Sequence, residues 1–267
     1  VLERMASRKS SRPIDLVIGL DQFLIDKAKK QLDWKKVQAS PIVYRFLRQH
    51  YSENVADEPI EFIPFDFAPI AFVTHNKQLQ KSISSLRDLF SKKLKNKISI
   101  QNPETATTGY IFWLWALKNG VANQISKDHF YTISTGWAES YGAFKKKNVE
   151  VTLSYLTSPV FHWVTENDRS VQPLVFNEGH PSQIEFLAIP AACKECQLAE
   201  QFVNFMLTEN IQKLLMEKNY MLPIDSDNMA GTEFSKLPEV KIIPSKDYSA
   251  LHKRKDEILK QWQQSFN

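Results

Sequence analysis

Segments with strand and helix character alternate along nearly the whole of this 267-residue chain. Short β-branched and apolar runs predict strands at residues 14–19, 60–73, 97–101, 130–134, 149–155 and 183–189. Segments with helical spacing lie at residues 22–30, 85–94, 105–117, 137–146, 198–207, 211–218 and 248–264. This alternation predicts an α/β fold, in which helices flank the sheets.

A chain of this length exceeds one small core and suits two lobes. No Gly/Ser-rich tether is present, so the lobes are expected to be joined by extended segments that cross between them. The candidates are residues 65–73 and 183–189. We therefore predict that residues 1–72 plus 183–267 form lobe 1 and that residues 73–182 form lobe 2.

The charge and hydropathy patterns exclude several classes of protein. The chain has 34 basic and 30 acidic residues, a net charge of +4, and its basic runs are scattered. That pattern, without a recognisable module, argues against a nucleic-acid partner. No apolar run approaches the ~20 residues that span a bilayer. Residues 1–9 lack the apolar centre of a signal peptide and suggest the end of an amphipathic helix that leads into the first strand.

The only two cysteines, Cys193 and Cys196, lie near the expected start of a helix. Ordinary thiols or a local disulfide are the first interpretation. A redox motif is a second, because a helix N-terminus lowers a thiol pKa, but no thioredoxin-like context surrounds the pair. A zinc site would need two further ligands, and none has motif spacing, so no metal site is predicted.

Enzyme signatures are scarce. The chain contains no nucleophile elbow, P-loop, zinc-protease helix or dinucleotide-binding glycine pattern. His180 follows a glycine and suggests a turn histidine bonded to the backbone. Asp66 with Glu139 is the one plausible acid–base pair, and both carboxylates suit structure or cation recognition better. We therefore expect no enzymatic activity and no cofactor.

Aromatic residues instead gather in turns that are rich in glycine, threonine and serine. The turns cover residues 102–109, 135–142, 155–161 and 219–223, in a chain with only seven glycines. Backbone N–H groups at a helix start can bind an anion or a polar group, although threonines there can also serve as caps. Several aromatic rings at such junctions suit a flat cationic ligand, because stacking and cation–π contacts contribute ~0.5–2 kcal/mol each.

These turns resemble the periplasmic thiamine-binding proteins of ABC importers. The resemblance runs from residues 15–21 to the final helix, and its sharpest segment is residues 135–144, Thr-Gly-Trp-Ala-Glu-Ser-Tyr-Gly-Ala-Phe. It also includes Phe65-Asp66, residues 153–159 and residues 178–180. The family implies a two-lobed type II periplasmic-binding-protein fold, with a ligand cleft between lobes joined by two crossing strands and closing by a hinge motion. It also implies delivery of thiamine or its phosphate esters to a permease in the inner membrane by a periplasmic monomer.

The resemblance implies a set of ligand-binding residues. The cleft aromatics correspond to Trp137, Tyr155, Phe161 and Tyr220, and Thr105 and Thr107 correspond to the turn near the phosphate end. The matching turns and strand also contribute Gly109, Gly136, Ser158 and Asp66.

The chain departs from the family at several positions. Tyr220 replaces a tryptophan and Phe161 a tyrosine. Glu104 replaces a basic residue and Ala106 a serine, which disfavours a phosphate ester. The family's opening β-α unit is also expected to be missing from lobe 1. A polyamine, a ferric ion or a phosphonate-type ligand stays open as an alternative, although Ser154-Tyr155 lacks the tyrosine pair of ferric sites.

Overall fold

The computed structural model describes residue 2, residues 13–91 and residues 94–266. The expected helix at residues 1–9 lies almost entirely outside these described residues. The chain divides into two compact units. Unit 1 comprises Val1–Phe67 and Ile184–Ala230, and unit 2 comprises Ala68–Gln183 and Gly231–Asn267. None of the helices in the described part of the chain combines the length and the apolar composition that a membrane span requires.

Unit 1 is built around two pairs of antiparallel strands. Its elements are β1 (Val17–Asp21), α2 (Ile25–Gln31), α3 (Pro41–His50), the first part of β2 (Phe62–Thr74), the last part of β7 (His180–Ala188), α9 (Cys196–Met206), α10 (Glu209–Asn219), β8 (Leu222–Pro223) and a short helix at Ser226–Met229. Strand β1 pairs with β7, and β8 pairs with β2. The Asp21 carboxylate accepts a hydrogen bond of 2.8 Å from Phe23 N, which fixes the turn into α2.

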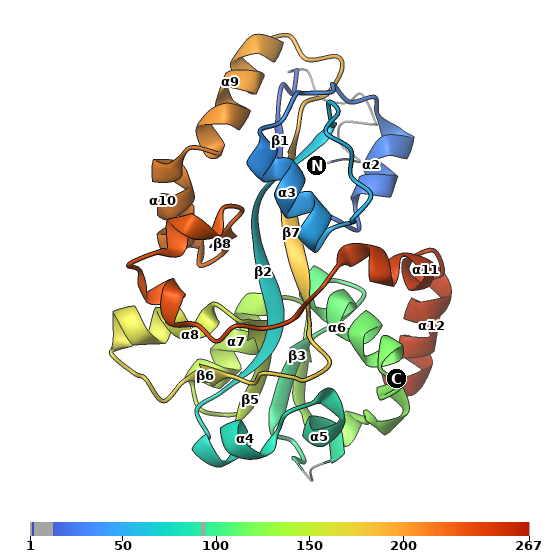
Figure 1. The fold of residues 1–267 in the computed structure, drawn as a ribbon. Helices are drawn as coiled ribbons and strands as arrows, with labels where there is room; N and C mark the ends of the chain where they lie inside the picture. The colour runs from blue at the N-terminus through green and yellow to red at the C-terminus, as the bar shows by residue number, and fades with distance from the viewer. Residues whose placement is uncertain (1, 3–12, 92–93, 267) are drawn as a thin grey trace. The chain divides into compact units, whose positions relative to one another are not determined.

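Unit 2 contains a mixed sheet with helices around it (Figure 1). Its strands are the rest of β2 and of β7, β3 (Ile98–Gln101), β4 (Phe130–Ser134), β5 (Val151–Tyr155), β6 (Gln172–Pro173) and β9 (Ile242–Ile243). Its α-helices are α4 (Lys77–Ser82), α5 (Leu86–Ser91), α6 (Thr107–Lys118), α7 (Trp137–Lys145), α8 (Ser158–Phe161), α11 (Ser249–His252) and α12 (Lys255–Phe266). Short 3-10 and π turns lie at Ala122–Gln124, Lys127–His129, His162–Glu166, Glu233–Lys236 and Ser245–Tyr248.

The sheet of unit 2 combines parallel and antiparallel pairs. Strand β3 lies between β4 and β5 and is parallel to both. Strand β5 is antiparallel to β2, which also pairs with β6. The α/β fold predicted from the sequence is confirmed, and strands β2 and β7 carry the chain from one unit into the other.

Helix α6 is buried on all sides from Thr108 to Ala116, because it packs against aromatic residues of both the sheet and the last helix. Phe112 meets Phe72 of β2 with ring centroids 5.5 Å apart. Trp113 meets Trp262 of α12 at 5.0 Å. Figure 1 shows α6 beside α12, as these contacts require.

The C-terminal segment differs from the predicted division of the chain. The sequence prediction placed all of residues 183–267 in lobe 1, whereas Gly231–Asn267 belongs to unit 2. This segment belongs to unit 2 because the apolar face of α12 is buried there. Its buried residues are Ile258, Trp262 and Phe266. The chain passes between the units at three points. Two of them, Phe67/Ala68 and Gln183/Ile184, lie within a few residues of the predicted boundaries, and the third, Ala230/Gly231, was not predicted.

Several helices also differ from the sequence prediction, because α3, α4 and α8 were not predicted and the last helix is divided. The single helix predicted at residues 248–264 is two helices, because Arg254 N bonds to Leu251 O at 2.9 Å and tightens the chain into a turn. Helix α3 was not predicted. Two signals in the sequence indicate this helix. Proline stands at its first position, Pro41, and its apolar residues Val43, Phe46 and Leu47 are spaced to form one buried face.

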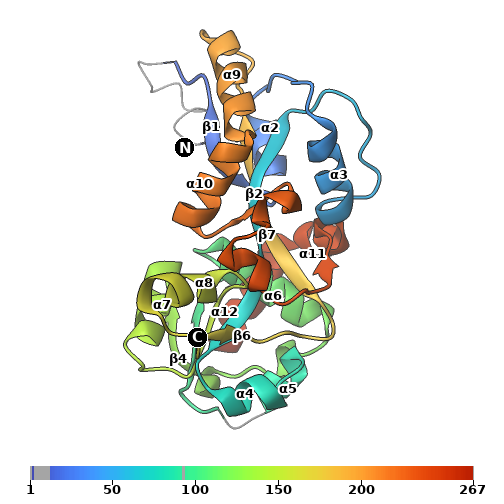
Figure 2. The same ribbon diagram turned by 60° about the vertical axis from the view of Figure 1, so that its left-hand side comes forward.

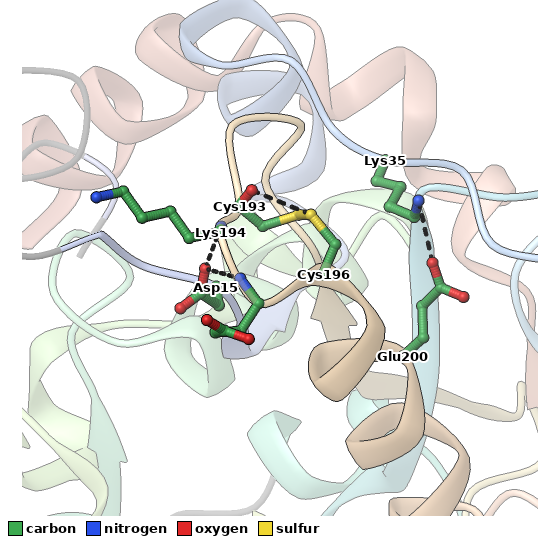
Figure 3. Close-up of a disulfide and its surroundings, with 7 residues drawn as sticks. Asp15, Lys35, Cys193, Lys194, Cys196 and Glu200 are labelled. Atoms are coloured by element: carbon green, nitrogen blue, oxygen red, sulfur yellow. Dashed lines mark hydrogen bonds and ion pairs between the residues drawn. A yellow bond between two sulfur atoms is a disulfide. The ribbon is translucent and has the colours of Figure 1, made fainter.

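Cys193 and Cys196 form a disulfide at the start of α9, with Cα atoms 5.3 Å apart. This is the local disulfide among the interpretations left open by the sequence. Asp15 lies beside the same turn, and its carboxylate accepts hydrogen bonds from Lys194 N at 2.6 Å and Glu195 N at 3.1 Å (Figure 3). Asp15 therefore caps α9 from a distant part of the sequence, because the N-cap residue Glu195 makes no side-chain cap bond of its own.

Candidate functional site

The carboxyl ends of β4, β3 and β5 meet at one edge of the unit 2 sheet, because the three strands are parallel neighbours. Each strand is followed by a turn and then by a helix, which is α7, α6 or α8 respectively. Ligands of open α/β sheets bind outside the carboxyl ends of the strands. This edge is therefore the candidate site in unit 2.

The turns after β3 and β4 are tied together by hydrogen bonds. Asn102 N donates to Ser134 O at 2.8 Å, and Thr105 Oγ1 donates to Thr135 O at 2.8 Å. Thr105 therefore joins two turns and does not cap α6, whose N-cap residue is Ala106 without a side-chain bond. Thr107 is the first residue of α6, so both threonines lie at the candidate edge.

Glu104 lies in the turn after β3 and is exposed. Its Oε1 accepts a hydrogen bond of 2.5 Å from Gln263 Nε2 of α12, which holds the carboxylate toward the last helix. The neighbouring backbone N–H is occupied as well, because Glu104 N donates to Asn102 Oδ1 at 3.0 Å. The turn after β3 is thus fixed on both sides, with a negative charge on its outer side.

The two glycines of the predicted site, Gly109 and Gly136, differ in their structural roles. Gly109 is buried, and a Cβ atom there would stand 2.3 Å from Gln101 O. It therefore permits α6 to approach β3 closely, which is a packing role. Gly136 is the N-cap residue of α7 and has extended backbone, with φ −155° and open space around its Cα. The backbone at Gly136 does not require glycine, because any residue adopts this conformation.

Trp137 begins α7 and presents its ring to solvent. Its side chain is 39% exposed although it is a large apolar group. The indole Nε1–H donates to Ser154 Oγ at 2.7 Å, which fixes the ring relative to β5. One face of the indole stacks on Tyr141, with centroids 4.6 Å apart and planes 17° from parallel. The ring is thus held at its N–H and on one face while remaining accessible.

Two serine hydroxyls lie beneath this tryptophan. Ser154 Oγ and Ser158 Oγ are 2.6 Å apart, and Ser158 Oγ also accepts from Tyr155 N at 3.3 Å. Since Ser154 already accepts from Trp137, the serine pair shares one O–H···O bond and has a second hydroxyl proton. The bonds described for these two residues supply no acceptor for that proton. Both serines are buried.

Tyr155 is the last residue of β5 and is partly exposed. Its hydroxyl donates to Gln183 Oε1 at 3.1 Å, which fixes the phenol next to β7. The serine bonds connect Tyr155 to Trp137 through β5 and the start of α8. The structure therefore links Trp137 to Ser158 through Ser154, and it joins Tyr155 to this pair through the Tyr155 backbone N–H, while the Tyr155 hydroxyl is bonded to Gln183.

Phe161 makes a different set of contacts. Lys145 Nζ, from the last turn of α7, lies 4.5 Å from the centroid of the Phe161 ring, and the His162 ring meets its edge at 5.4 Å. The described contacts of Phe161 are thus made at the C-terminal end of α7, whereas Trp137 stands at its N-terminal end. Figure 2 shows α7 and α8 side by side.

The remaining predicted residues, Asp66 and Tyr220, belong to unit 1. Asp66 on β2 is buried, and its Oδ2 accepts from Asn219 Nδ2 at 3.1 Å, whereas its Oδ1 has no hydrogen-bond partner in the described part of the chain. Burial and then the nearby charge of Glu185 raise the pKa of Asp66, against the opposing effect of the Asn219 bond. Tyr220 is the C-cap of α10 and has φ 55°, a left-handed conformation uncommon for residues other than glycine.

Several residues that shape these sites were missed by the sequence prediction. In unit 2 they are Tyr141, His162 and Glu166; in unit 1 they are Asn219 and Glu185. Tyr141 stands one helical turn after Trp137, and His162 and Glu166 are spaced i, i+4, so these signals were present in the sequence. Among the described residues, no group of three or more His, Cys, Asp or Glu side chains could hold a metal ion.

The other member of the candidate acid–base pair, Glu139, lies exposed in the first turn of α7 in unit 2, whereas Asp66 belongs to unit 1. Buried His180 bonds through Nδ1 to Ile70 O at 2.8 Å and accepts from Phe176 N at 2.9 Å. The expected bonding of His180 to the backbone is thus confirmed, whereas its expected place in a turn is wrong, because His180 is the first residue of β7.

Residues 11–244 match the family of bacterial extracellular solute-binding proteins. The chain belongs to this family. It is also 30% identical over 234 residues to the thiamine-binding periplasmic protein of Escherichia coli K12, covering 84% of this chain and 68% of that protein. The protein of the same name from Salmonella typhimurium LT2 is 29% identical over 238 residues, again with 84% and 68% covered. These relatives are named for solute binding and not for an enzymatic activity, so this chain is a solute-binding protein and not an enzyme.

Solved structures agree with the family. A periplasmic thiamin binding protein matches all of this chain and 83% of its own, with a TM-score of 0.80 and 28% identity. A ferric binding protein from Campylobacter jejuni matches with a TM-score of 0.73 at 18% identity over 97% of this chain and 87% of its own. At that identity the second match supports the fold alone. The predicted type II periplasmic-binding-protein fold of this solute-binding protein is therefore confirmed.

Proposed function

We propose that this solute-binding protein binds thiamine or a phosphate ester of thiamine and delivers it to the membrane permease of an ABC importer. Two named thiamine-binding relatives and a thiamin-binding structural neighbour support the ligand class. The same relatives are periplasmic, which supports a periplasmic location for this chain. We further propose that the protein acts as a monomer, without a nucleic-acid partner and without a cofactor.

The observation that carries this proposal is the accessible indole of Trp137 at the carboxyl edge of β4, β3 and β5. Its ring is held by the hydrogen bond to Ser154 and by stacking on Tyr141, so the side chain loses little conformational freedom on binding. Thiamine contains a cationic thiazolium ring, and a tryptophan face is the strongest aromatic partner for a cation. We propose that Tyr155 and Ser158 provide a second ring and a hydroxyl beside it.

The turns at Thr105, Thr107 and Gly136 would receive the polar end of the ligand. The helices α6 and α7 begin there without side-chain caps, and uncapped helix N-termini attract anions. Glu104 opposes this attraction because it adds a carboxylate to the turn before α6. Its exposed side chain is held toward α12 by Gln263, so salt screens part of the effect. We therefore expect thiamine to bind more tightly than its mono- and diphosphate.

Isothermal titration calorimetry with thiamine, thiamine monophosphate, thiamine diphosphate, spermidine and ferric citrate tests the proposed ligand class. The proposal predicts saturable binding of thiamine at one site per chain and weaker binding of the two esters. Tighter binding of spermidine or ferric citrate than of any thiamine species would overturn it. Variants Asp66→Asn, Tyr220→Phe and Phe161→Ala, titrated with the same panel, test separately whether these three residues take part.

A further inference from the structure

The exposed indole of Trp137, which we call the Trp137 platform, stacks on the ring of a second residue. That residue, Tyr141, is not among the ligand-binding residues predicted from the sequence. Tyr141 lies one helical turn after Trp137 on α7, and the two rings are nearly parallel with centroids 4.6 Å apart. Tyr141 itself is buried. The orientation of the exposed indole therefore depends on what holds the buried phenol.

Tyr141 is held by a histidine of defined tautomer. His162 Nδ1 lies 2.5 Å from Glu166 Oε2, and a carboxylate oxygen can only accept, so Nδ1 carries the proton. In the neutral imidazole, Nε2 is then an acceptor, and the Tyr141 hydroxyl donates to it at 2.8 Å. The other acceptor near this hydroxyl, Ser158 O, is farther away at 3.4 Å.

Glu166 is in turn fixed by Lys145 at the C-terminal end of α7, the helix that begins with Trp137. Lys145 Nζ, in the last turn of α7, lies 3.1 Å from Glu166 Oε1. Burial acts to raise the pKa of Glu166, but hydrogen bonds from Lys145 and His162 hold it below its ordinary value, so the carboxylate is charged at neutral pH. The charges of Asp168 and Lys147 also act in this region. The contacts therefore run from Trp137 through Tyr141, His162 and Glu166 back to α7 at Lys145.

We propose that Tyr141, His162 and Glu166 are positioning residues, which hold the Trp137 ring in the orientation that receives the ligand. This inference rests on the proposed function. The three residues act through Trp137, because the hydroxyl, imidazole and carboxylate bond to one another beneath the platform. A platform fixed before binding loses less conformational freedom when the ligand stacks on it.

Fluorescence isolates Trp137 from the other tryptophans. Those at positions 34, 113, 115, 163 and 262 are all buried, so a neutral quencher such as acrylamide reaches Trp137 far more readily. Trp137→Phe supplies the background to subtract. This readout needs no ligand, and acrylamide is insensitive to the change of charge in a carboxylate variant.

Two variants remove hydrogen bonds that hold Tyr141 but keep an aromatic ring stacked on Trp137. Tyr141→Phe deletes the hydroxyl that bonds to His162, and Glu166→Gln deletes the charge that fixes the histidine. Matched controls in the same unit are Tyr131→Phe, an exposed tyrosine of β4, and Glu239→Gln, an exposed glutamate. Thermal melts of all four variants establish that each is folded under the conditions of the quenching and binding experiments.

The proposal predicts that Tyr141→Phe and Glu166→Gln increase acrylamide quenching of Trp137 in the ligand-free protein and weaken thiamine binding about threefold to tenfold. Both controls should match the wild type in both measurements. Quenching and affinity unchanged in the two support variants would overturn the positioning role. If the wild type does not bind thiamine but quenching rises as expected, the positioning of Trp137 stands and the proposed ligand fails.

Discussion

Thr105 Oγ1 donates a hydrogen bond of 2.8 Å to the main-chain oxygen of Thr135, and this bond joins the turn that precedes α6 to the turn that precedes α7. The two helix starts are therefore held next to each other at one edge of the sheet, although about 30 residues separate them in sequence. The rigidity of that edge is what the proposed ligand platform requires. Both α6 and α7 start there without a side-chain cap.

Trp137 should contribute more to ligand affinity than Phe161. Trp137→Ala removes an accessible ring and an N–H group and is expected to cost about 2–4 kcal/mol of binding free energy, against about 1–2 kcal/mol for Phe161→Ala. The Phe161 ring is already in contact with Lys145, which supports the smaller value. Calorimetric titration of both variants with thiamine measures the difference. Equal or reversed losses would show that Trp137 is scaffold.

Gly109 should be irreplaceable by alanine for reasons of packing. The added Cβ would meet Gln101 O at 2.3 Å, so α6 or β3 must shift, and Gly109→Ala is expected to lose at least about 2 kcal/mol of unfolding free energy. The matched control is Gly142→Ala in α7, where nothing lies within 4 Å and the better helix former should gain about 0.5–1 kcal/mol. Urea unfolding of the two variants measures both effects. Similar stabilities would contradict the close approach of α6 to β3.

His180 should make the protein less stable in acid. Burial lowers its pKa to about 4 from the ordinary 6.5, with the bond to Ile70 O opposing the shift. Its Nε2 accepts from Phe176 N at 2.9 Å, so a proton there would break that bond. The neutral form is favoured in the folded state, and its stabilisation is complete above pH 6.5 and lost between pH 6.5 and about 4. The loss over that window is on the order of 2–4 kcal/mol.

Proton NMR of the His180 ring checks this expectation. The ring resonance should not titrate between pH 7 and about 5, unlike that of an exposed histidine. A midpoint near the ordinary histidine value would show that His180 is solvated. Unfolding in urea at two pH values on either side of 6 then measures the linked loss of stability.

Asp15 and the Cys193–Cys196 disulfide hold the same turn, and their contributions should be coupled. Asp15→Ala is expected to cost about 1 kcal/mol, since it deletes two cap bonds, and breaking so short a loop costs about 2 kcal/mol. With both cysteines replaced by serine, Asp15→Ala should cost less, because the turn no longer holds the two N–H groups in place. A double-mutant cycle by chemical unfolding measures the coupling, and simple additivity would refute it.

Local sequence patterns predicted most of the elements because their signals are short-range. The strand predicted at residues 130–134 coincides with β4, and the helix predicted at residues 137–146 differs from α7 by one residue. The place of the C-terminal segment was predicted wrongly, because the contact of Trp262 with Trp113 joins positions far apart in sequence. Local spacing carries no information about such pairs.

Residue types at the candidate site were easier to predict than their roles. Trp137 is accessible, as a ligand-binding ring must be, but Gly109 serves packing and Thr105 joins two turns. These roles depend on a distance to Gln101 O and on an acceptor at Thr135, which only the folded chain defines. The support by His162 and Glu166 was missed because a histidine beside a carboxylate is common on helix surfaces.

Stacking of thiamine on Trp137 can be observed directly at the indole N–H. NMR of protein labelled with ¹⁵N-tryptophan resolves the indole N–H signals, and Trp137→Phe assigns the one that belongs to Trp137. Titration with thiamine should shift this signal and saturate at one equivalent, with smaller changes in the signals of the buried tryptophans. A Trp137 signal that stays in place while calorimetry reports saturable thiamine binding would contradict stacking on Trp137 and place the ligand elsewhere.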